Sequence, residues 1–99
     1  MVTATDPVQV APDVYSVLFE NERVRVLDVR MRPGARSAMH EHPDSVFYLL
    51  TPMKAKFTAG DGTSIEAEFP AGVVWRPAEA HSVENIGATE MTAVAVELK

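Results

Sequence analysis

The 99-residue sequence contains no cysteine, which excludes both a disulfide framework and a thiolate metal site. No apolar stretch approaches the roughly 20 residues that a membrane-spanning helix requires. Lys and Arg number nine against 14 Asp and Glu, and the net charge of −5 argues against nucleic acid or an anionic membrane as a partner. Residues 1–10 lack the basic start and apolar run of a secretory signal, so we expect a cytoplasmic protein.

Turn signals at residues 33–34, 60–62 and 70–72 separate short segments rich in Val, Phe, Tyr and Thr. A chain of this length holds one core. The pattern predicts an all-β, single-domain sandwich or barrel over residues 13–99, preceded by an N-terminal arm at 1–12 that is frayed or lent to a partner subunit. The expected strands lie within 13–22, 22–31, 46–50, 54–69 (a hairpin), 72–77, 81–87 and 91–99.

Three of these segments carry more specific expectations. In residues 22–31 the apolar side chains change face near Val26 and Leu27, which predicts either a β-bulge or a strand that passes from one sheet to another. Residues 46–50 are continuously apolar, which predicts a strand buried on both faces. In the hairpin, Asp61 and Gly62 are expected to supply the two positive-φ residues of a tight turn.

Histidine is scarce, with three residues in the whole chain, yet two of them stand one residue apart. His40 and His42 would point to the same side of a strand. His81 also lies in a strand-like segment. A lone histidine in a β protein is usually an ordinary polar residue, but three neutral imidazoles with open positions would make a catalytic site for Fe, Zn, Cu or Ni.

Two sequence patterns surround these histidines. The first, G-x5-H-x-H-P, runs from Gly34 to Pro43, and the second, G-x4-P-x3-H-x3-N, runs from Gly72 to Asn85. From about Tyr15 onward the chain resembles the cupin superfamily, and within it the short single-domain cupins labelled beta-alanine degradation proteins. The resemblance implies a small double-stranded β-helix (jelly-roll) barrel. It also implies one divalent metal ion bound by positions that match His40, His42 and His81.

The chain departs from the common cupin motifs at the metal site. Val46 and Phe47 occupy the places where a ligating Glu is expected, and Glu79 stands where the second motif has glycine. Asp44 is near but not at the matching position, so its reach to the metal stays open. We therefore expect three histidines without a carboxylate, a set that keeps the full charge of a dication and leaves positions for substrate.

Such a site favours a small anionic chelating substrate, an oxo acid or a dicarbonyl. With Fe(II), the favoured ion, the resemblance to three-histidine cupins that cleave acetylacetone implies a dioxygenase-like enzyme. With Zn, Ni or Mn the site would suit a non-redox lyase or isomerase. No side chain stands out as a general base, which keeps a non-catalytic binding or sensing barrel as a third possibility.

Four further residues are candidates for lining the pocket or for contacting and orienting the metal ligands: Asn85, Phe47, Tyr48 and Trp75. Asn85 would otherwise satisfy backbone groups at a strand end, and Tyr48 and Trp75 would otherwise be core residues. Arg36 and Arg76 have the geometry to clamp a substrate carboxylate, but we expect both at the surface. A homodimer is expected, because a small barrel has sheet edges to cover and an unassigned arm to cover them with.

Overall fold

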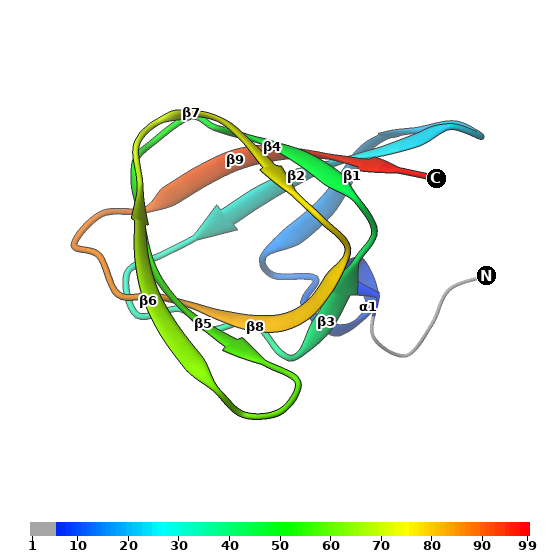
Figure 1. Cartoon of the computed structure of the whole chain (residues 1–99). Helices are drawn as coiled ribbons and strands as arrows, with labels where there is room; N and C mark the ends of the chain where they lie inside the picture. The colour runs from blue at the N-terminus through cyan, green and yellow to red at the C-terminus, as the bar shows by residue number, and fades with distance from the viewer. Residues whose placement is uncertain (1–5) are drawn as a thin grey trace.

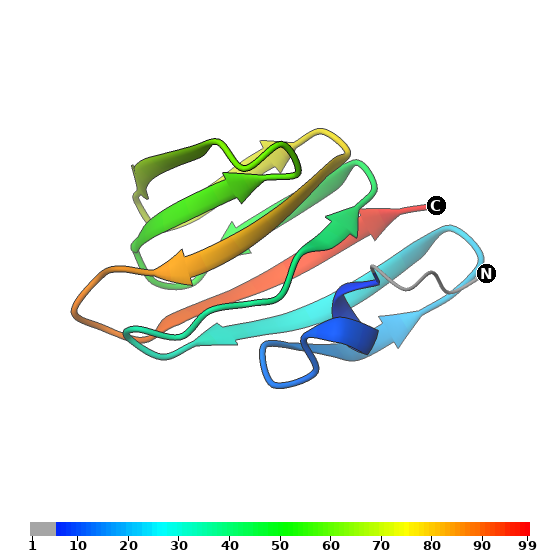
Figure 2. The same cartoon turned by 90° about the horizontal axis from the view of Figure 1, so that it is seen from below.

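Alternation of apolar and polar residues gives the chain two antiparallel sheets that face each other, as expected for an all-β protein (Figures 1 and 2). The computed structural model describes residues 6–99. The larger sheet has the order β1-β2-β9-β4-β7 and the smaller one β3-β8-β5-β6. The strands are β1 Tyr15–Glu20, β2 Val24–Met31, β3 His40–His42, β4 Ser45–Leu49, β5 Met53–Ala59, β6 Ser64–Phe69, β7 Gly72–Arg76, β8 Glu79–Asn85 and β9 Met91–Leu98.

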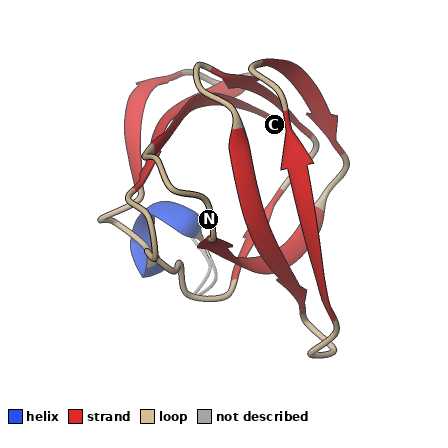
Figure 3. Ribbon diagram, turned by 90° about the vertical axis from the view of Figure 1, so that its left-hand side faces the viewer, coloured by secondary structure: helices blue, strands red, loops and turns tan. Residues whose placement is uncertain are grey.

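The core lies between the sheets, where every second residue of a strand points inward. On the larger sheet Leu27 and Val29 of β2 lie opposite Ala95 and Ala93 of the neighbouring β9, and all four are buried. The smaller sheet contributes Ala55 and Val83. Figure 3 shows the strands curling around this common interior.

The predicted bulge exists, but on the neighbouring strand. The register between β1 and β2 shifts between Val17 and Phe19, so Leu18 is the extra residue and β2 itself alternates regularly. Leu27, Val29 and Met31 of β2 are buried, while Val26 points to the outer face. The change of apolar face in the sequence therefore has another cause, namely that the outer face of this sheet is also apolar.

Two finer expectations were wrong for related reasons. The segment predicted to be buried on both sides became β4, whose Tyr48 is exposed on the outer face while Leu49 is buried. In the hairpin only Gly62 takes a positive φ, of 89°, and four residues connect β5 to β6 instead of two. The Asp61 carboxylate instead accepts hydrogen bonds from the backbone and hydroxyl of Thr63, which stabilises the longer turn.

Part of the expected N-terminal arm is folded against its own chain. Helix α1 (Pro7–Val10) begins at Asp6, whose side chain accepts a hydrogen bond from the Val8 amide, and packs on β1 and β3. Pro7 and Ala11 are buried, so burial of these apolar groups holds the segment in place. Residues 1–5 lie outside the described part. Within residues 6–99 no helix is long and apolar enough to cross a membrane.

A core substitution tests the packing between the sheets. Leu27→Ala removes a side chain with no exposed surface, and we expect the free energy of unfolding to fall by about 2–5 kcal/mol, through lost burial and the cavity left behind. Urea unfolding followed by circular dichroism measures this. Leu50→Ala, at an exposed leucine of the same sheet region, is the matched control and should cost less than about 1 kcal/mol. Equal losses in the two variants would contradict the assigned core.

Candidate metal centre

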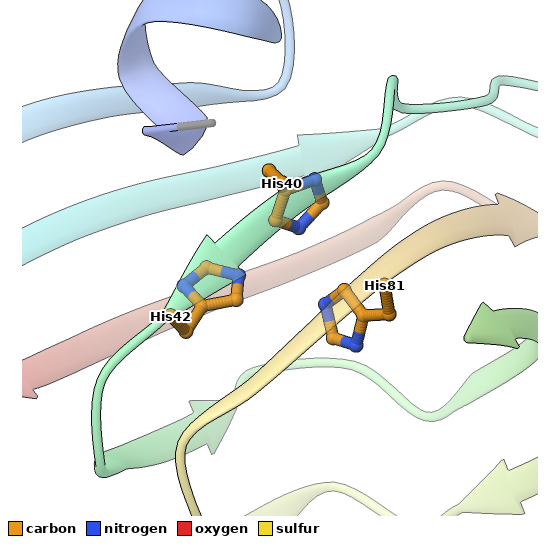
Figure 4. Close-up of side chains that lie close together, drawn as sticks. All are labelled: His40, His42 and His81. Atoms are coloured by element: carbon orange, nitrogen blue, oxygen red, sulfur yellow. The ribbon is translucent and has the colours of Figure 1, made fainter. Parts of the chain in front are cut away.

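The pairing of β3 with β8 brings the three histidines together. His40 and His42 are two residues apart on β3 and share its inner face, and His81 on β8 lies directly opposite His40. All three are buried, and each offers a ring nitrogen that lies within 4.8 Å of those of the other two. Figure 4 shows one nitrogen of each ring turned towards the centre of the group.

Hydrogen bonds fix which nitrogen of the β3 histidines is free. His40 Nδ1 lies 2.7 Å from the carbonyl oxygen of Ala38, so Nδ1 carries the proton and donates it. His42 Nδ1 lies 2.8 Å from Glu97 Oε2 and donates in the same way. The Nε2 atom of each ring is therefore unprotonated and carries a lone pair. That of His40 accepts from the Tyr15 hydroxyl at 3.1 Å, whereas that of His42 is buried without any partner.

His81 is placed by a different pair of residues. Its Nδ1 lies 3.0 Å from Glu79 Oε1, the distance of an ion pair, but the angle is not that of a hydrogen bond, and Nδ1 has no hydrogen-bond partner. The same Glu79 oxygen is bound by the Arg76 guanidinium. The carboxylate is thus shared between Arg76 and the back of the His81 ring, and the other ring nitrogen faces His40 and His42.

This arrangement fits a metal ion. A buried nitrogen lone pair without a partner, as on His42 Nε2, is costly unless a donor or a cation completes it. Neutral imidazole nitrogen suits Zn, Fe, Ni and Cu, and three such donors leave positions open for other ligands. Among residues 6–99 the group able to hold an ion consists of these histidines alone. Phe47 stands where a carboxylate was expected, with its ring 5.5 Å from that of His42.

Burial keeps His40 and His81 unprotonated, which is the state that binds a cation. Burial is the main cause that lowers the pKa of His40 to about 4 and that of His81 to about 3, and the neighbouring histidines add to both shifts. Both rings are therefore neutral at pH 7 and can act as ligands. Burial, reinforced by the charge of Glu97, raises the pKa of Tyr15 well above its usual value, so its hydroxyl keeps its proton.

A buried line of charges stands behind His42. One carboxylate oxygen of Glu97 accepts a hydrogen bond from His42 Nδ1, and the other forms an ion pair with Arg25 at 2.8 Å. Arg25 also forms an ion pair with Asp6 at 2.9 Å. Glu97 is almost fully buried. A carboxylate behind a ligating imidazole fixes its tautomer and raises its basicity.

Sequence reasoning missed Glu97 and Tyr15. The signal for Glu97 was present, since its place in the alternation of β9 is on the buried face with Ala93 and Ala95. A carboxylate on such a face needs a partner. Tyr15 gave no comparable signal, because its contact with His40 joins residues 25 positions apart.

A mostly apolar cavity opens next to the histidines. Its volume is about 50 Å³ when measured as space for the centres of water molecules, enough for a few waters or a small ligand. Arg76 and Glu79 are the charged residues among the described lining. The lining comprises Tyr15, Val29, Met31, His42, Phe47, Leu49, Met53, Phe57, Phe69, Val74, Arg76, Pro77, Glu79, His81, Val83 and Met91.

The other candidate residues are only partly brought to this site. Phe47 lines the cavity, but Tyr48 and Trp75 are about half exposed on the outer face and do not. Asn85 binds backbone instead, donating to Met31 O at 2.9 Å and to Thr89 O at 3.0 Å. The Asp44 carboxylate accepts from the Ala78 amide at 2.8 Å, and Asp44 is not part of the ligand group.

The two candidate arginines, Arg36 and Arg76, lie in different environments. Arg36 is exposed and pairs with Glu84 at 3.3 Å, as expected for a surface residue. Arg76 was also expected at the surface, but its side chain is only 26% exposed and lines the cavity. Its guanidinium lies 5.1 Å from the centre of the Phe57 ring, a cation–π contact.

Comparison with known proteins supports the fold and the family. No family model and no curated protein matches the chain. Among solved structures, a cupin domain from Bordetella pertussis is 30% identical, with a TM-score of 0.78 and coverage of 87% of this chain and 92% of that one.

More distant structures share the fold alone. A protein with a double-stranded beta-helix domain from Klebsiella pneumoniae is 22% identical, with a TM-score of 0.68, covering 99% of this chain and 81% of that one. A predicted oxalate decarboxylase from Thermotoga maritima is also 22% identical, with a TM-score of 0.60 and coverage of 85% and 77%.

The lowered histidine pKa values predict an acid-sensitive metal-free protein. Unfolded histidines take up protons near pH 6.5, whereas folded His40 and His81 do so only at about pH 4 and 3. Unfolding therefore takes up protons between these limits, and the free energy of unfolding should fall by roughly 4 kcal/mol from pH 7 to pH 5, half of it from each histidine. Urea unfolding of chelator-treated protein at both pH values measures this. The loss should shrink in His40→Gln/His81→Gln, and an unchanged midpoint in the wild-type protein would refute the assignment.

Glu97→Gln tests the role of the charge behind His42. The amide keeps the shape but removes the charge that orients and polarises the imidazole, so metal affinity should fall about 10- to 100-fold. Competition with a chromophoric chelator measures this affinity. Glu90→Gln removes an exposed carboxylate and is the control that should leave it unchanged. Equal affinities for Glu97→Gln and wild type would show that Glu97 only neutralises Arg25.

Proposed function

The chain belongs to the cupin superfamily, and from this premise we propose that it is a metal-dependent, dioxygenase-like enzyme acting on a small oxo acid or dicarbonyl. The observation that carries the proposal is the buried convergence of His40, His42 and His81 at one end of an apolar cavity. Fe(II) is the favoured ion, with Zn, Ni or Mn as alternatives. The motifs resemble those of cupins labelled beta-alanine degradation proteins, a label that defines no reaction, so we base the substrate class on the cavity.

Charge favours an anionic substrate. Three neutral imidazoles do not reduce the charge of a divalent ion, and both nearby carboxylates are engaged with guanidinium groups. Glu97 is paired with Arg25, and Glu79 with Arg76. The site would therefore keep its positive charge until an anion binds, and a ligand that chelates through two oxygens would neutralise it best.

The walls of the cavity limit the size and polarity of that anion. Its lining is mostly methionine, phenylalanine and branched aliphatic side chains, and its volume is about 50 Å³. A compact molecule with a small apolar body fits this space. The name of the Thermotoga structure, a predicted oxalate decarboxylase, also indicates a small carboxylic acid, though at 22% identity this is an analogy of fold.

The protein's own groups would orient such a substrate. A bound divalent ion would supply Lewis acidity, and iron would add redox chemistry with oxygen. The Tyr15 hydroxyl, held next to His40 Nε2 and kept protonated, is a hydrogen-bond donor at the polar end of the cavity. Arg76, on the cavity wall, can offer its guanidinium to a second carboxylate if it exchanges with Glu79.

The same geometry supports two other functions. Zn, Ni or Mn in the site would suit a lyase or isomerase that stabilises an enolate. A non-catalytic binding or sensing barrel is favoured by one observation, that the single carboxylate among the described lining residues, Glu79, is already bound to Arg76 and is poorly placed as a base.

Elemental analysis followed by oxygen uptake tests the proposal. Protein purified without chelator should contain about one equivalent of iron, and His40→Ala/His42→Ala should lose it while keeping the β-rich circular dichroism spectrum. Oxygen consumption with dicarbonyls or oxo acids should follow the iron content.

Other results decide between the alternatives. Zn, Ni or Mn with substrate turnover but no oxygen use would favour the non-redox enzyme. Thermal stabilisation by a small acid without turnover would favour the sensing barrel. Failure of the wild-type protein to bind any of these metals would refute a metal-dependent function.

A further inference from the structure

The Tyr15 hydroxyl is hydrogen-bonded to an atom that the candidate metal centre also requires. Its oxygen lies 3.1 Å from His40 Nε2. His40 Nδ1 is committed to the carbonyl oxygen of Ala38, so Nε2 is the nitrogen that His40 can offer to a metal ion. An imidazole nitrogen has one lone pair. The Tyr15 hydroxyl and a metal ion therefore compete for the same lone pair, and a bound ion would leave the hydroxyl without this acceptor.

The packing of the Tyr15 ring keeps the hydroxyl at the site. Tyr15 is the first residue of β1 and is only 3% exposed. Its ring meets those of His40 and His42 at steep angles, with centroids 5.0 Å and 5.4 Å away. Its backbone amide donates to the carbonyl oxygen of Ala11 at 3.0 Å. A hydroxyl that loses the His40 nitrogen therefore stays in the interior, away from water.

A buried hydroxyl without a hydrogen-bond partner is costly, so a new acceptor is needed. His42 Nε2 would be taken by the same ion. The cavity beside the Tyr15 ring is mostly apolar, and the carboxylate of Glu79 in its lining is already bound to Arg76. The remaining source of an acceptor is a molecule in the cavity, at one of the positions that three histidines leave open on an ion.

We propose that Tyr15 recognises the anionic oxygen of the substrate, and that its hydroxyl transfers its hydrogen bond from His40 Nε2 to that oxygen when the ion and the substrate bind. The inference rests on the proposed function and adds to it a residue that determines the affinity for anions. Burial, reinforced by the charge of Glu97, raises the pKa of Tyr15, so the hydroxyl keeps the proton that it donates.

The exchange of partners favours anions over neutral ligands. A hydrogen bond to a charged acceptor is shorter and stronger than one to a neutral acceptor such as imidazole or water. The carboxylate of an oxo acid or the enolate oxygen of a dicarbonyl would therefore gain more from the Tyr15 hydroxyl than a water molecule would. The same hydroxyl that occupies His40 Nε2 in the metal-free protein thus selects the substrate in the loaded one.

Binding measurements with Co²⁺ and pyruvate, a small oxo acid, test the inference. Tyr15→Phe keeps the ring that packs on His40 and His42 and removes only the hydroxyl. Co²⁺ affinity, measured by competition with a chromophoric chelator, should stay within about threefold of wild type, because one neutral hydrogen bond is lost with and without the ion. The affinity of the Co²⁺-loaded protein for pyruvate, followed by visible absorption, should fall by about 10-fold or more, because the lost bond has a charged acceptor.

The other tyrosine of the chain provides the matched control. Tyr48 is 51% exposed on the outer face, so Tyr48→Phe removes a hydroxyl far from the cavity lining and should leave both affinities unchanged. Circular dichroism of both variants checks that the β-rich fold is kept.

The pattern of the two affinities separates recognition from a structural role. If Tyr15 only holds His40 in place, Tyr15→Phe would lose Co²⁺ affinity while the loaded fraction binds pyruvate as wild type does, and that result would overturn the inference. Wild-type values for both affinities would overturn it too, while leaving the proposed function intact. Failure of the wild-type protein to bind Co²⁺, or of its loaded form to bind pyruvate, would instead count against the proposed function, and the inference would fall with it.

Discussion

The register between β3 and β8 is the constraint on which the candidate site depends. Side chains alternate along a strand, so a slip of one residue would turn His40 and His42 to the outside. Three residues of β3 cannot hold this register alone. The preceding segment runs along β8 and adds hydrogen bonds, among them Gly34 N to Asn85 O at 2.8 Å and Ser37 N to Val83 O at 2.8 Å. Asn85 in turn anchors the end of β8 to Met31 of the other sheet.

The metal ligands are also tied to buried charge. His42, Glu97, Arg25 and Asp6 form one line of alternating partners from the cavity towards α1. A buried charge is tolerated when each member of such a line is paired. The consequence is that the ligand geometry and the docking of α1 share an electrostatic network, so the short helix, which also packs on β3, contributes to the site.

Much of the fold could be predicted from the sequence, because strands follow from local period-two patterns. The candidate ligands were identified from that pattern for His40 and His42 and from the resemblance to the cupin motifs for the whole set with His81. The strands from β1 to β9 match the segments expected of them to within two residues, apart from β3, which was recognised through its histidines. Glu97 and Tyr15 were missed, because their partners lie 55 and 25 residues away and only the tertiary fold brings them together. Tyr48, Trp75 and the bulge were misplaced for one shared reason. The rule that apolar residues point inward fails on a sheet whose outer face is apolar as well.

The central strand of the larger sheet is also the last strand of the fold. β9 lies between β2 and β4, and its pairing with β2 joins residues as far apart as Val24 and Leu98. Closing so long a loop is entropically costly, and sheets dominated by distant pairings fold slowly. Until β9 inserts, β2 and β4 have open edges and His42 has no carboxylate behind it. The candidate site is therefore complete only once β9 has paired with β2 and β4, and an ion met before that would find His42 without the carboxylate that orients it.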